Sequence, residues 1–154
     1  EEVWSSAPAA VLTRIADALG RAMGGTSGPL YATGLLRASQ TLPESPAAPD
    51  WCAALEAGVN AITELGGAKP GDRTMLDALH PAVIAFAAGL GADRSATEAW
   101  GEAVAAARDG TAATAHMYPN LGRASYLGHR AIGTLDAGAA AAAIWIKAVW
   151  PLPE

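Results

Sequence analysis

Residues 136–147 read DAGAAAAAIWIK, and this stretch sets the fold class. Alanine is the strongest helix former, and Asp136 stands where a polar residue commonly begins a helix. The apolar part of the stretch ends at Lys147, well short of the ~20 residues that a membrane-spanning helix needs. We therefore expect a packed helix here that ends before Pro151, and no membrane segment in the chain.

The same bias extends over the whole chain. Among its 154 residues 39 are Ala, whereas Val and Ile together number 12. Because β-branched residues favour strands and Ala favours helices, this balance predicts an all-α fold, built as an antiparallel helical bundle or barrel. Apolar spacing of three and four residues predicts about six helices, over residues 6–23, 29–40, 51–65, 74–90, 96–117 and 137–150.

Individual residues mark the expected helix ends. Asp50 and Asp72 can cap the third and fourth helices through their carboxylates. Ser95 and Glu98 have the Ser-x-x-Glu form of a capping box at the start of the fifth. Pro81 lies within the fourth predicted helix, where we expect a kink rather than a break.

Composition and charge exclude several classes of protein. The length fits one compact domain over residues 1–154. With 51% apolar and 16% charged residues the chain is not disordered, and a single Cys excludes a disulfide scaffold. A net charge of -5 without a Lys/Arg-dense stretch argues against nucleic acid as a partner.

Two further features bear on location and metals. The N-terminus reads EEVW and lacks the basic and apolar parts of a secretory signal, so we expect a cytoplasmic protein. No histidine has a second ligand at position i+3 or i+4, so we expect all three to be structural or exposed rather than to bind a metal. They are His80, His116 and His129.

The first of three unusual loops reads GGTSGP at residues 24–29 and runs into a predicted helix N-terminus. Glycines let the backbone approach a ligand, and free amides with the hydroxyls of Thr26 and Ser27 suit an anion. The same composition is also typical of a tight turn between helices. Both interpretations stay open on this loop alone, and the pattern is not a Walker loop.

The other two loops each carry an arginine. The second, PGDRTM at residues 70–75, places Arg73 where it can reach an anion or a carboxylate. The third, GRASYLG at residues 122–128, leaves Arg123 between Gly and Ala with room to set its guanidinium on a phosphate. An exposed surface charge is the alternative for Arg123.

Four blocks together resemble one known family. In chain order they are MGGTSGPLY (23–31), PGDRTMLD (70–77), GRASYLG (122–128) and DAGA (136–139). Their residues, order and spacing resemble the nucleotide-binding domain, or L subunit, of the dihydroxyacetone kinase family. The resemblance runs over about residues 11–149, and four blocks in register are far more specific than any single loop.

The resemblance implies a barrel of antiparallel helices, eight in the complete family domain, that binds ADP or ATP at one end. It places Thr26 and Ser27 on the phosphates and Met75 against the adenine. Arg123 is the implied catalytic residue, which stabilises charge on the transferring phosphoryl group. The remaining implied nucleotide contacts are Gly66, Asp136, Ala137 and Gly138, with Ala137 standing where the family usually has proline.

The family's magnesium ions are not matched by residues of this sequence. The resemblance implies that an aspartate cluster of the form Asp-x-x-x-Gly-Asp-x-Asp-x-Gly holds Mg²⁺, ahead of the first helix. Residues 1–10 do not contain it. Because phosphoryl transfer relies on metal ions to neutralise charge, we expect this stretch alone to bind nucleotide weakly and to transfer nothing. We expect the first helix and the metal loop to lie upstream of Glu1 in a longer chain.

The implied function is a kinase domain that passes phosphate to dihydroxyacetone held on a separate K domain or subunit. In one branch of the family ATP is the direct donor, and in the other a phosphotransferase-system M subunit recharges bound ADP. Two alternatives remain at this point: a non-catalytic nucleotide-sensing or partner-binding domain of the same fold, and a domain of the fatty-acid-kinase type. The sequence does not separate dihydroxyacetone from related short ketoses, and it does not give the oligomeric state.

Overall fold

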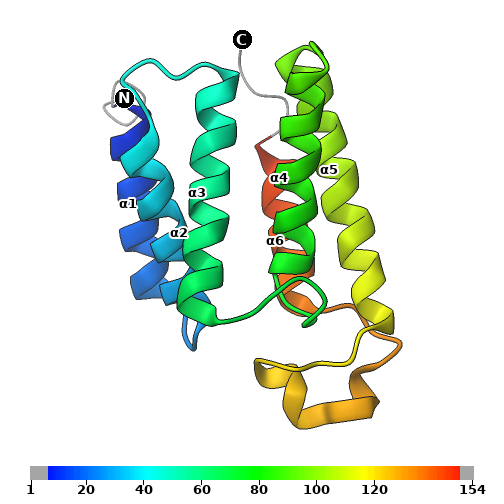
Figure 1. The fold of residues 1–154 in the computed structure, drawn as a ribbon. Helices are drawn as coiled ribbons and strands as arrows, with labels where there is room; N and C mark the ends of the chain where they lie inside the picture. Colours follow the sequence, from blue (N-terminus) through cyan, green and yellow to red (C-terminus); the bar gives the residue numbers. More distant parts are fainter. Residues whose placement is uncertain (1–6, 150–154) are drawn as a thin grey trace. The chain divides into compact units, whose positions relative to one another are not determined.

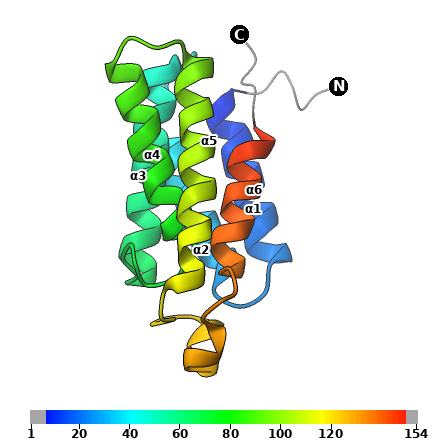
Figure 2. The ribbon, with the colours of Figure 1, turned by 90° about the vertical axis from the view of Figure 1, so that its right-hand side faces the viewer.

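The computed structural model describes residues 7–149, and within that range the chain forms helices and no strand, as Figure 1 and Figure 2 show from two sides. The all-α prediction is confirmed. Each of the six predicted helices is found, and the fifth ends earlier than expected, in a 3₁₀ turn. The elements are α1 (Pro8–Ala22), α2 (Ser27–Thr41), α3 (Ala48–Gly66), α4 (Leu76–Gly91), α5 (Ala96–Ala113), η2 (Thr114–His116), η3 (Arg123–Ala131) and α6 (Ala137–Ala148).

Two helices begin with the predicted caps. The Ser95 hydroxyl accepts a hydrogen bond from the Glu98 N–H at 3.2 Å, and the Glu98 carboxylate accepts from the Ser95 N–H at 3.0 Å. Hydrogen bonds from the Ser95 side chain and then its backbone lower the pKa of Glu98. At α6, Asp136 Oδ2 accepts from the Ala139 N–H at 2.8 Å. Both caps satisfy amides that have no partner within their helix.

Two predicted caps are wrong. Asp50 lies inside the first turn of α3 rather than before it, and its Oδ2 accepts from the Ala47 N–H at 2.8 Å. A carboxylate in the first turn still favours the positive end of the helix dipole. Asp72 does not cap α4, which begins at Leu76, because its Oδ2 accepts from the Lys69 N–H within the preceding loop.

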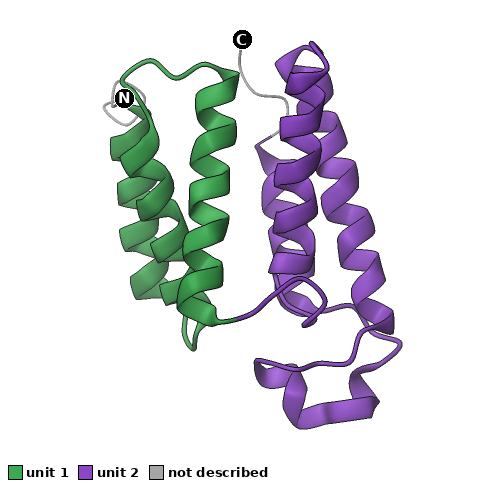
Figure 3. Cartoon of the chain, viewed as in Figure 1, with its two compact units in different colours: residues 1–67 green, residues 68–154 purple. Residues whose placement is uncertain are grey.

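The chain divides at Gly67 and Ala68 into two compact units (Figure 3). Unit 1 contains α1, α2 and α3, and unit 2 contains α4, α5, α6 and the two 3₁₀ segments. None of the described helices combines the length and the apolar character that a membrane crossing requires. The barrel and the single domain over residues 1–154 stay predictions.

Unit 1 is an antiparallel set of three helices in which α2 packs against both α1 and α3 (Figure 1). Small residues bring α2 and α3 close together. A Cβ added at Gly34 would lie 3.2 Å from the Gly58 carbonyl oxygen, and one at Gly58 would lie 2.8 Å from the Gly34 oxygen. Tyr31, Val59 and Ile62 are buried around this crossing, so they form the core of the unit.

Unit 2 packs α4 and α6 against α5, which runs antiparallel to both, and α4 and α6 also contact each other (Figure 2). Phe86 of α4 and Trp100 of α5 meet edge to face, with ring centroids 5.1 Å apart. Both rings are buried, and such pairs add about 0.5–1.5 kcal/mol beyond the burial of their area. Ala-rich faces fill the rest of the core, so the helices lie close together.

A close contact in unit 2 joins α4 to α5 at Gly110. Pro81 has no N–H, so the Asp77 carbonyl loses its partner within α4, yet the helix continues beyond it. Gly110 of α5 lies against that carbonyl. A Cβ at Gly110 would overlap the Asp77 oxygen and would lie 3.0 Å from Pro81 Cγ. Glycine is therefore required here by packing, although it weakens the isolated helix.

The substitution Gly110→Ala should lower the free energy of unfolding by about 1–3 kcal/mol, because the new methyl group forces α4 and α5 apart. Gly91→Ala is the matched control, since a Cβ there meets nothing within 4 Å. It should leave stability unchanged or raise it by up to about 1 kcal/mol. Thermal and denaturant unfolding measure both, and an equal effect of the two substitutions would contradict the packing.

Candidate functional site

The Gly-rich turn before α2 lies in unit 1 and is one of the segments predicted to contact the nucleotide. Thr26 immediately precedes α2 and is exposed, and Ser27 is the first residue of the helix and half-buried. Neither hydroxyl makes a hydrogen bond with the described residues. A Cβ at Gly28 would overlap the Met23 carbonyl oxygen, so this tight turn excludes larger residues at that position.

Gly66 lies at the same end of unit 1. It is the last residue of α3, is exposed, and a Cβ there would lie 3.1 Å from Leu30 Cδ2 in the first turn of α2. Thr26, Ser27 and Gly66, which the resemblance implies as nucleotide contacts, thus lie at one end of unit 1.

In unit 2 the loop of residues 69–75, here called the clamp loop, is organised by Arg73. Its side chain is 3% exposed, and its backbone φ of 62° lies in the left-handed region that non-glycine residues rarely adopt. Nε donates to the Thr114 carbonyl at 3.2 Å, and Nη2 donates to the carbonyls of Ala131 at 3.0 Å and Thr134 at 2.9 Å. Nη1 lies 3.9 Å from Asp136 Oδ1.

Neighbouring carboxylates fix the rest of the clamp loop. Asp77 is buried and accepts from the N–H groups of Gly71 at 2.5 Å and Thr74 at 2.8 Å. Asp72 Oδ1 accepts from Asn120 Nδ2 at 3.0 Å, and the Asp72 carbonyl accepts from the Asn120 N–H at 3.4 Å. The loop is therefore tied both to the start of α4 and to the segment that precedes Arg123.

The turn before α6 lies beside Met75 at the start of α4. A Cβ at Gly138 would lie 2.9 Å from Asp136 Oδ2 and 3.3 Å from the Met75 N–H nitrogen. Met75 and Asp136 are buried, whereas Ala137 is exposed. The Thr114 hydroxyl accepts from the Asp136 N–H at 2.9 Å and thereby holds the turn from the end of α5.

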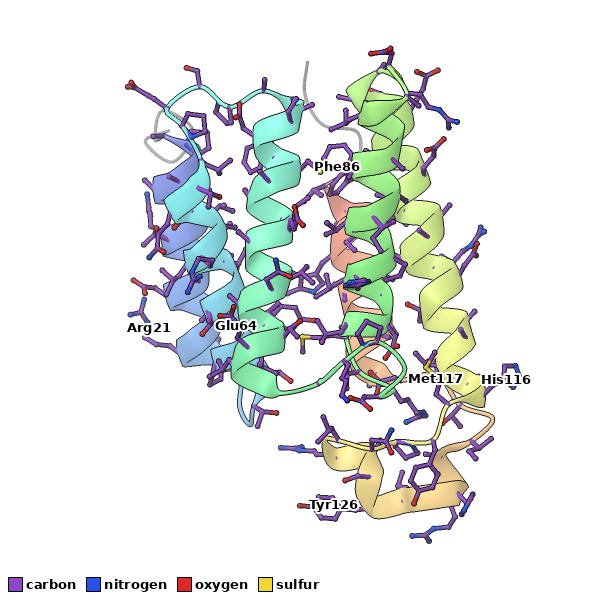
Figure 4. All side chains as sticks on the ribbon, viewed as in Figure 1. Arg21, Glu64, Phe86, His116, Met117 and Tyr126 are labelled. Atoms are coloured by element: carbon purple, nitrogen blue, oxygen red, sulfur yellow. The ribbon has the colours of Figure 1, made fainter. Side chains whose placement is uncertain are left out.

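Residues 117–135, here called the lobe, connect α5 to α6 beyond the ends of those helices (Figure 1). Arg123 begins η3, is exposed, and makes no ion pair or side-chain hydrogen bond with the described residues. Tyr126 is 87% exposed and points away from the helices (Figure 4). An unpaired guanidinium next to Gly122, whose φ is 71°, is accessible to an anion.

Among residues 7–149 there is no group of three or more His, Cys, Asp or Glu side chains that could hold a metal ion. His80, His116 and His129 are exposed, as predicted. The described residues therefore do not fit magnesium, and no step of the chemistry below is assigned through it.

The DAK2 domain family matches residues 1–150 of the chain. The chain belongs to this family. The resemblance drawn from the four sequence blocks is thus confirmed, and the chain is a domain of the dihydroxyacetone-kinase type.

This DAK2 domain is similar to several named kinases. "Triokinase/FMN cyclase" of Mus musculus is 39% identical over 144 residues, which are 94% of this chain and 25% of that protein. "Putative 3,4-dihydroxy-2-butanone kinase" of Solanum lycopersicum is 38% identical over 92% of this chain and 25% of its own length. "D-erythrulose kinase" of Mycolicibacterium smegmatis is 37% identical over 90% of this chain and 24% of its own length.

A solved structure supports the same relationship. The dihydroxyacetone kinase of C. freundii, determined in complex with AMP-PNP and Mg²⁺, is 31% identical, with a TM-score of 0.70 over 93% of this chain and 23% of that one. The DAK2 domain thus spans about a quarter of the length of the relatives it matches.

Sequence reasoning missed the polar groups that hold the DAK2 domain's site segments in place. It offered Arg73 only as a group for an anion or a carboxylate, but the side chain is buried and bonded to three carbonyls. Thr114 carried no signal in the sequence, although its side chain is fully buried. The sequence block around Arg73 was recognised, but the residues that accept hydrogen bonds from Arg73 lie about 40 to 60 residues further along the chain.

Replacing Thr114 by Val should lower the free energy of unfolding by about 1–3 kcal/mol, because it leaves the buried Asp136 N–H without a partner. Thr97→Val is the control, since Thr97 is exposed in the first turn of α5 and its side chain has no hydrogen bond within the described residues. Denaturant unfolding compares the two. A Thr114→Val protein as stable as the control would show that the hydroxyl does not hold the turn.

Proposed function

We propose that this domain binds ADP or ATP and supplies the phosphoryl group in the phosphorylation of a short-chain ketose. The observation that carries the proposal is the exposed, unpaired guanidinium of Arg123, borne by a segment that is fastened to the clamp loop. Family membership, and the AMP-PNP bound to the C. freundii relative, support an adenine nucleotide as the ligand.

In unit 2, we assign Met75 to the adenine and the turn at Asp136, Ala137 and Gly138 to the nucleotide backbone. Gly138 is required there by packing, since a Cβ would lie 2.9 Å from Asp136 Oδ2 and 3.3 Å from the Met75 nitrogen, and this close contact holds the turn beside Met75. Arg123 would place its fork of N–H donors on the transferring phosphoryl group and stabilise the charge that develops there.

In unit 1, we assign Thr26 and Ser27 to phosphate oxygens and Gly66 to a further nucleotide contact. The two hydroxyls and the first amides of α2 are donors without partners among the described residues. These assignments follow the resemblance and are separate from the argument for unit 2. Residues 7–149 contain no group of three or more His, Cys, Asp or Glu side chains for magnesium, so neither unit is assigned a role through that ion.

The acceptor is proposed to be a three- or four-carbon ketose held on a separate domain or K-type subunit. Triose, dihydroxybutanone and erythrulose appear in the names of the relatives, and they share a chain of three or four carbons with a carbonyl group and a primary alcohol. The donor branch is part of the same proposal: ATP directly, or ADP recharged by a phosphotransferase-system M subunit. A non-catalytic nucleotide sensor is the second candidate, favoured by the lack of a carboxylate cluster in the described residues.

Calorimetric titration of the protein with ADP and ATP, each with and without Mg²⁺, tests nucleotide binding. Arg123→Met should weaken ATP binding about tenfold or more, because it removes a charge-assisted contact. Arg130→Met is the matched control, since Arg130 is an exposed arginine of the same 3₁₀ segment without a side-chain partner in the described residues. It should change the dissociation constant less than about twofold, the range of an exposed charge without a partner.

The second part of the test adds a K-type subunit and a ketose. Product formed with ATP supports the direct branch, and product formed only with phosphoenolpyruvate and an M subunit supports the other. Binding of nucleotide without product is the result expected of residues 1–154 without the aspartate cluster, and the same result with that cluster added ahead of Glu1 supports the sensor. Absence of ADP and ATP binding, with and without Mg²⁺, would overturn the proposed function.

A further inference from the structure

The lobe that carries Arg123 is fastened to the rest of unit 2 at both of its ends by two adjacent residues. At its beginning, Asn120 is bonded to Asp72 through side chain and backbone. At its end, the carbonyls of Ala131 and Thr134 accept from Arg73. Both attachments thus start from neighbouring positions of the clamp loop.

Between these attachments the lobe has no hydrogen bond to the rest of unit 2 among the described residues. The hydrogen bonds that residues 121–130 make with described residues stay within the lobe, as in the bond from the Ser125 hydroxyl to the Gly122 carbonyl. Tyr118 and His129 meet edge to face inside the lobe, with centroids 5.0 Å apart. The Gly133 N–H donates to the Ala115 carbonyl and is a third link, close to the Arg73 attachment.

The clamp loop also contacts the two other segments of unit 2 that we assign to the nucleotide, which are the Asp136 turn and Met75. Arg73 lies 3.9 Å from Asp136, the residue that caps α6, and Met75 follows Arg73 by two residues at the start of α4. A planar guanidinium can donate in several directions at once, and an ammonium group cannot reproduce that fork. A displaced Arg73 would therefore shift Met75, the Asp136 turn and the lobe together.

We propose that Asp72 and Arg73 are positioning residues, which set the place of Arg123 and of the Asp136–Gly138 turn relative to Met75. The inference rests on the proposed nucleotide site and goes beyond it, because neither residue is assigned a contact with the ligand. Asp72 positions the beginning of the lobe, close to Arg123. Arg73 positions the end of the lobe and also the Asp136–Gly138 turn.

The Asp72–Asn120 pair allows a test by exchange. Asn120→Asp sets two carboxylates against each other and should weaken ATP binding about fivefold to tenfold, with a smaller effect on ADP. Adding Asp72→Asn restores a donor and an acceptor in the opposite order, and the amide oxygen introduced at position 72 can still accept from the Lys69 N–H. The double variant should bind ATP within about twofold of the parent protein, since the hydrogen bond is re-formed.

Arg73→Lys tests the second residue. It should weaken binding of both ADP and ATP about tenfold, since it loosens the turn as well as the lobe. Arg108→Lys is the control, because Arg108 lies on the exposed face of α5 and pairs only with Asp109 among the described residues. It should bind both nucleotides like the parent.

Each outcome of these titrations decides a different claim. A parent protein that binds neither nucleotide overturns the proposed function and this inference with it. A parent that binds, together with a double variant no better than Asn120→Asp, overturns the role of Asp72. Arg73→Lys with unchanged binding overturns the role of Arg73. Melting temperatures show whether a variant that binds nucleotide weakly is still folded. Recovery of binding by the double variant is a second control, because only a folded protein can bind.

Discussion

A guanidinium buried in a protein core has to be surrounded by acceptors, and this constraint organises one end of unit 2. Arg73 satisfies it with the carbonyls of Thr114, Ala131 and Thr134, and with the carboxylate of Asp136. An N–H group of the Arg73 guanidinium left without an acceptor in the interior would cost more free energy than a hydrogen bond at the surface contributes. The end of α5, the end of the lobe and the start of α6 are therefore held to one loop.

The proposed function depends on that arrangement, because the helices contribute little chemistry of their own. Their faces are rich in alanine, and the residues that we assign to the nucleotide lie at or beyond helix ends. Phosphoryl transfer needs fixed donors around a developing charge far more than it needs a nucleophile from the protein. A loop that fixes the position of several donors is thus as important as the donors themselves.

The helices could be predicted from the sequence because their signals are local. The signals are the alanine-rich stretches, the Ser95–Glu98 capping box and the Asp136 cap, each of which lies within a few residues. Both caps are found in the structure, and the alanine-rich stretch after Asp136 forms α6. Asp50 and Asp72 were misassigned because a carboxylate near a helix start has several amides within reach. Gly110 has low helix propensity, and its importance depends on a distant contact, because there α5 meets a carbonyl freed by Pro81.

The candidate site was predictable only in part. Its segments were recognised as four blocks, but the bonds that hold them, such as Arg73 to Thr134 or Asp72 to Asn120, join residues far apart in sequence. No periodicity or spacing rule reports such pairs. Burial of Arg73 was equally hidden, because an arginine in a Gly- and Pro-containing loop is usually solvated.

The most direct test of the account is an amide NMR titration of the protein with ADP. The account predicts that shift changes concentrate at Met75, at Arg123 and at residues 136–138 in unit 2, with Thr26 and Ser27 responding in unit 1. It also predicts that the changes at Arg123 diminish in the Asn120→Asp variant. Changes confined to other surfaces, or none at saturating ADP, would contradict the central claim.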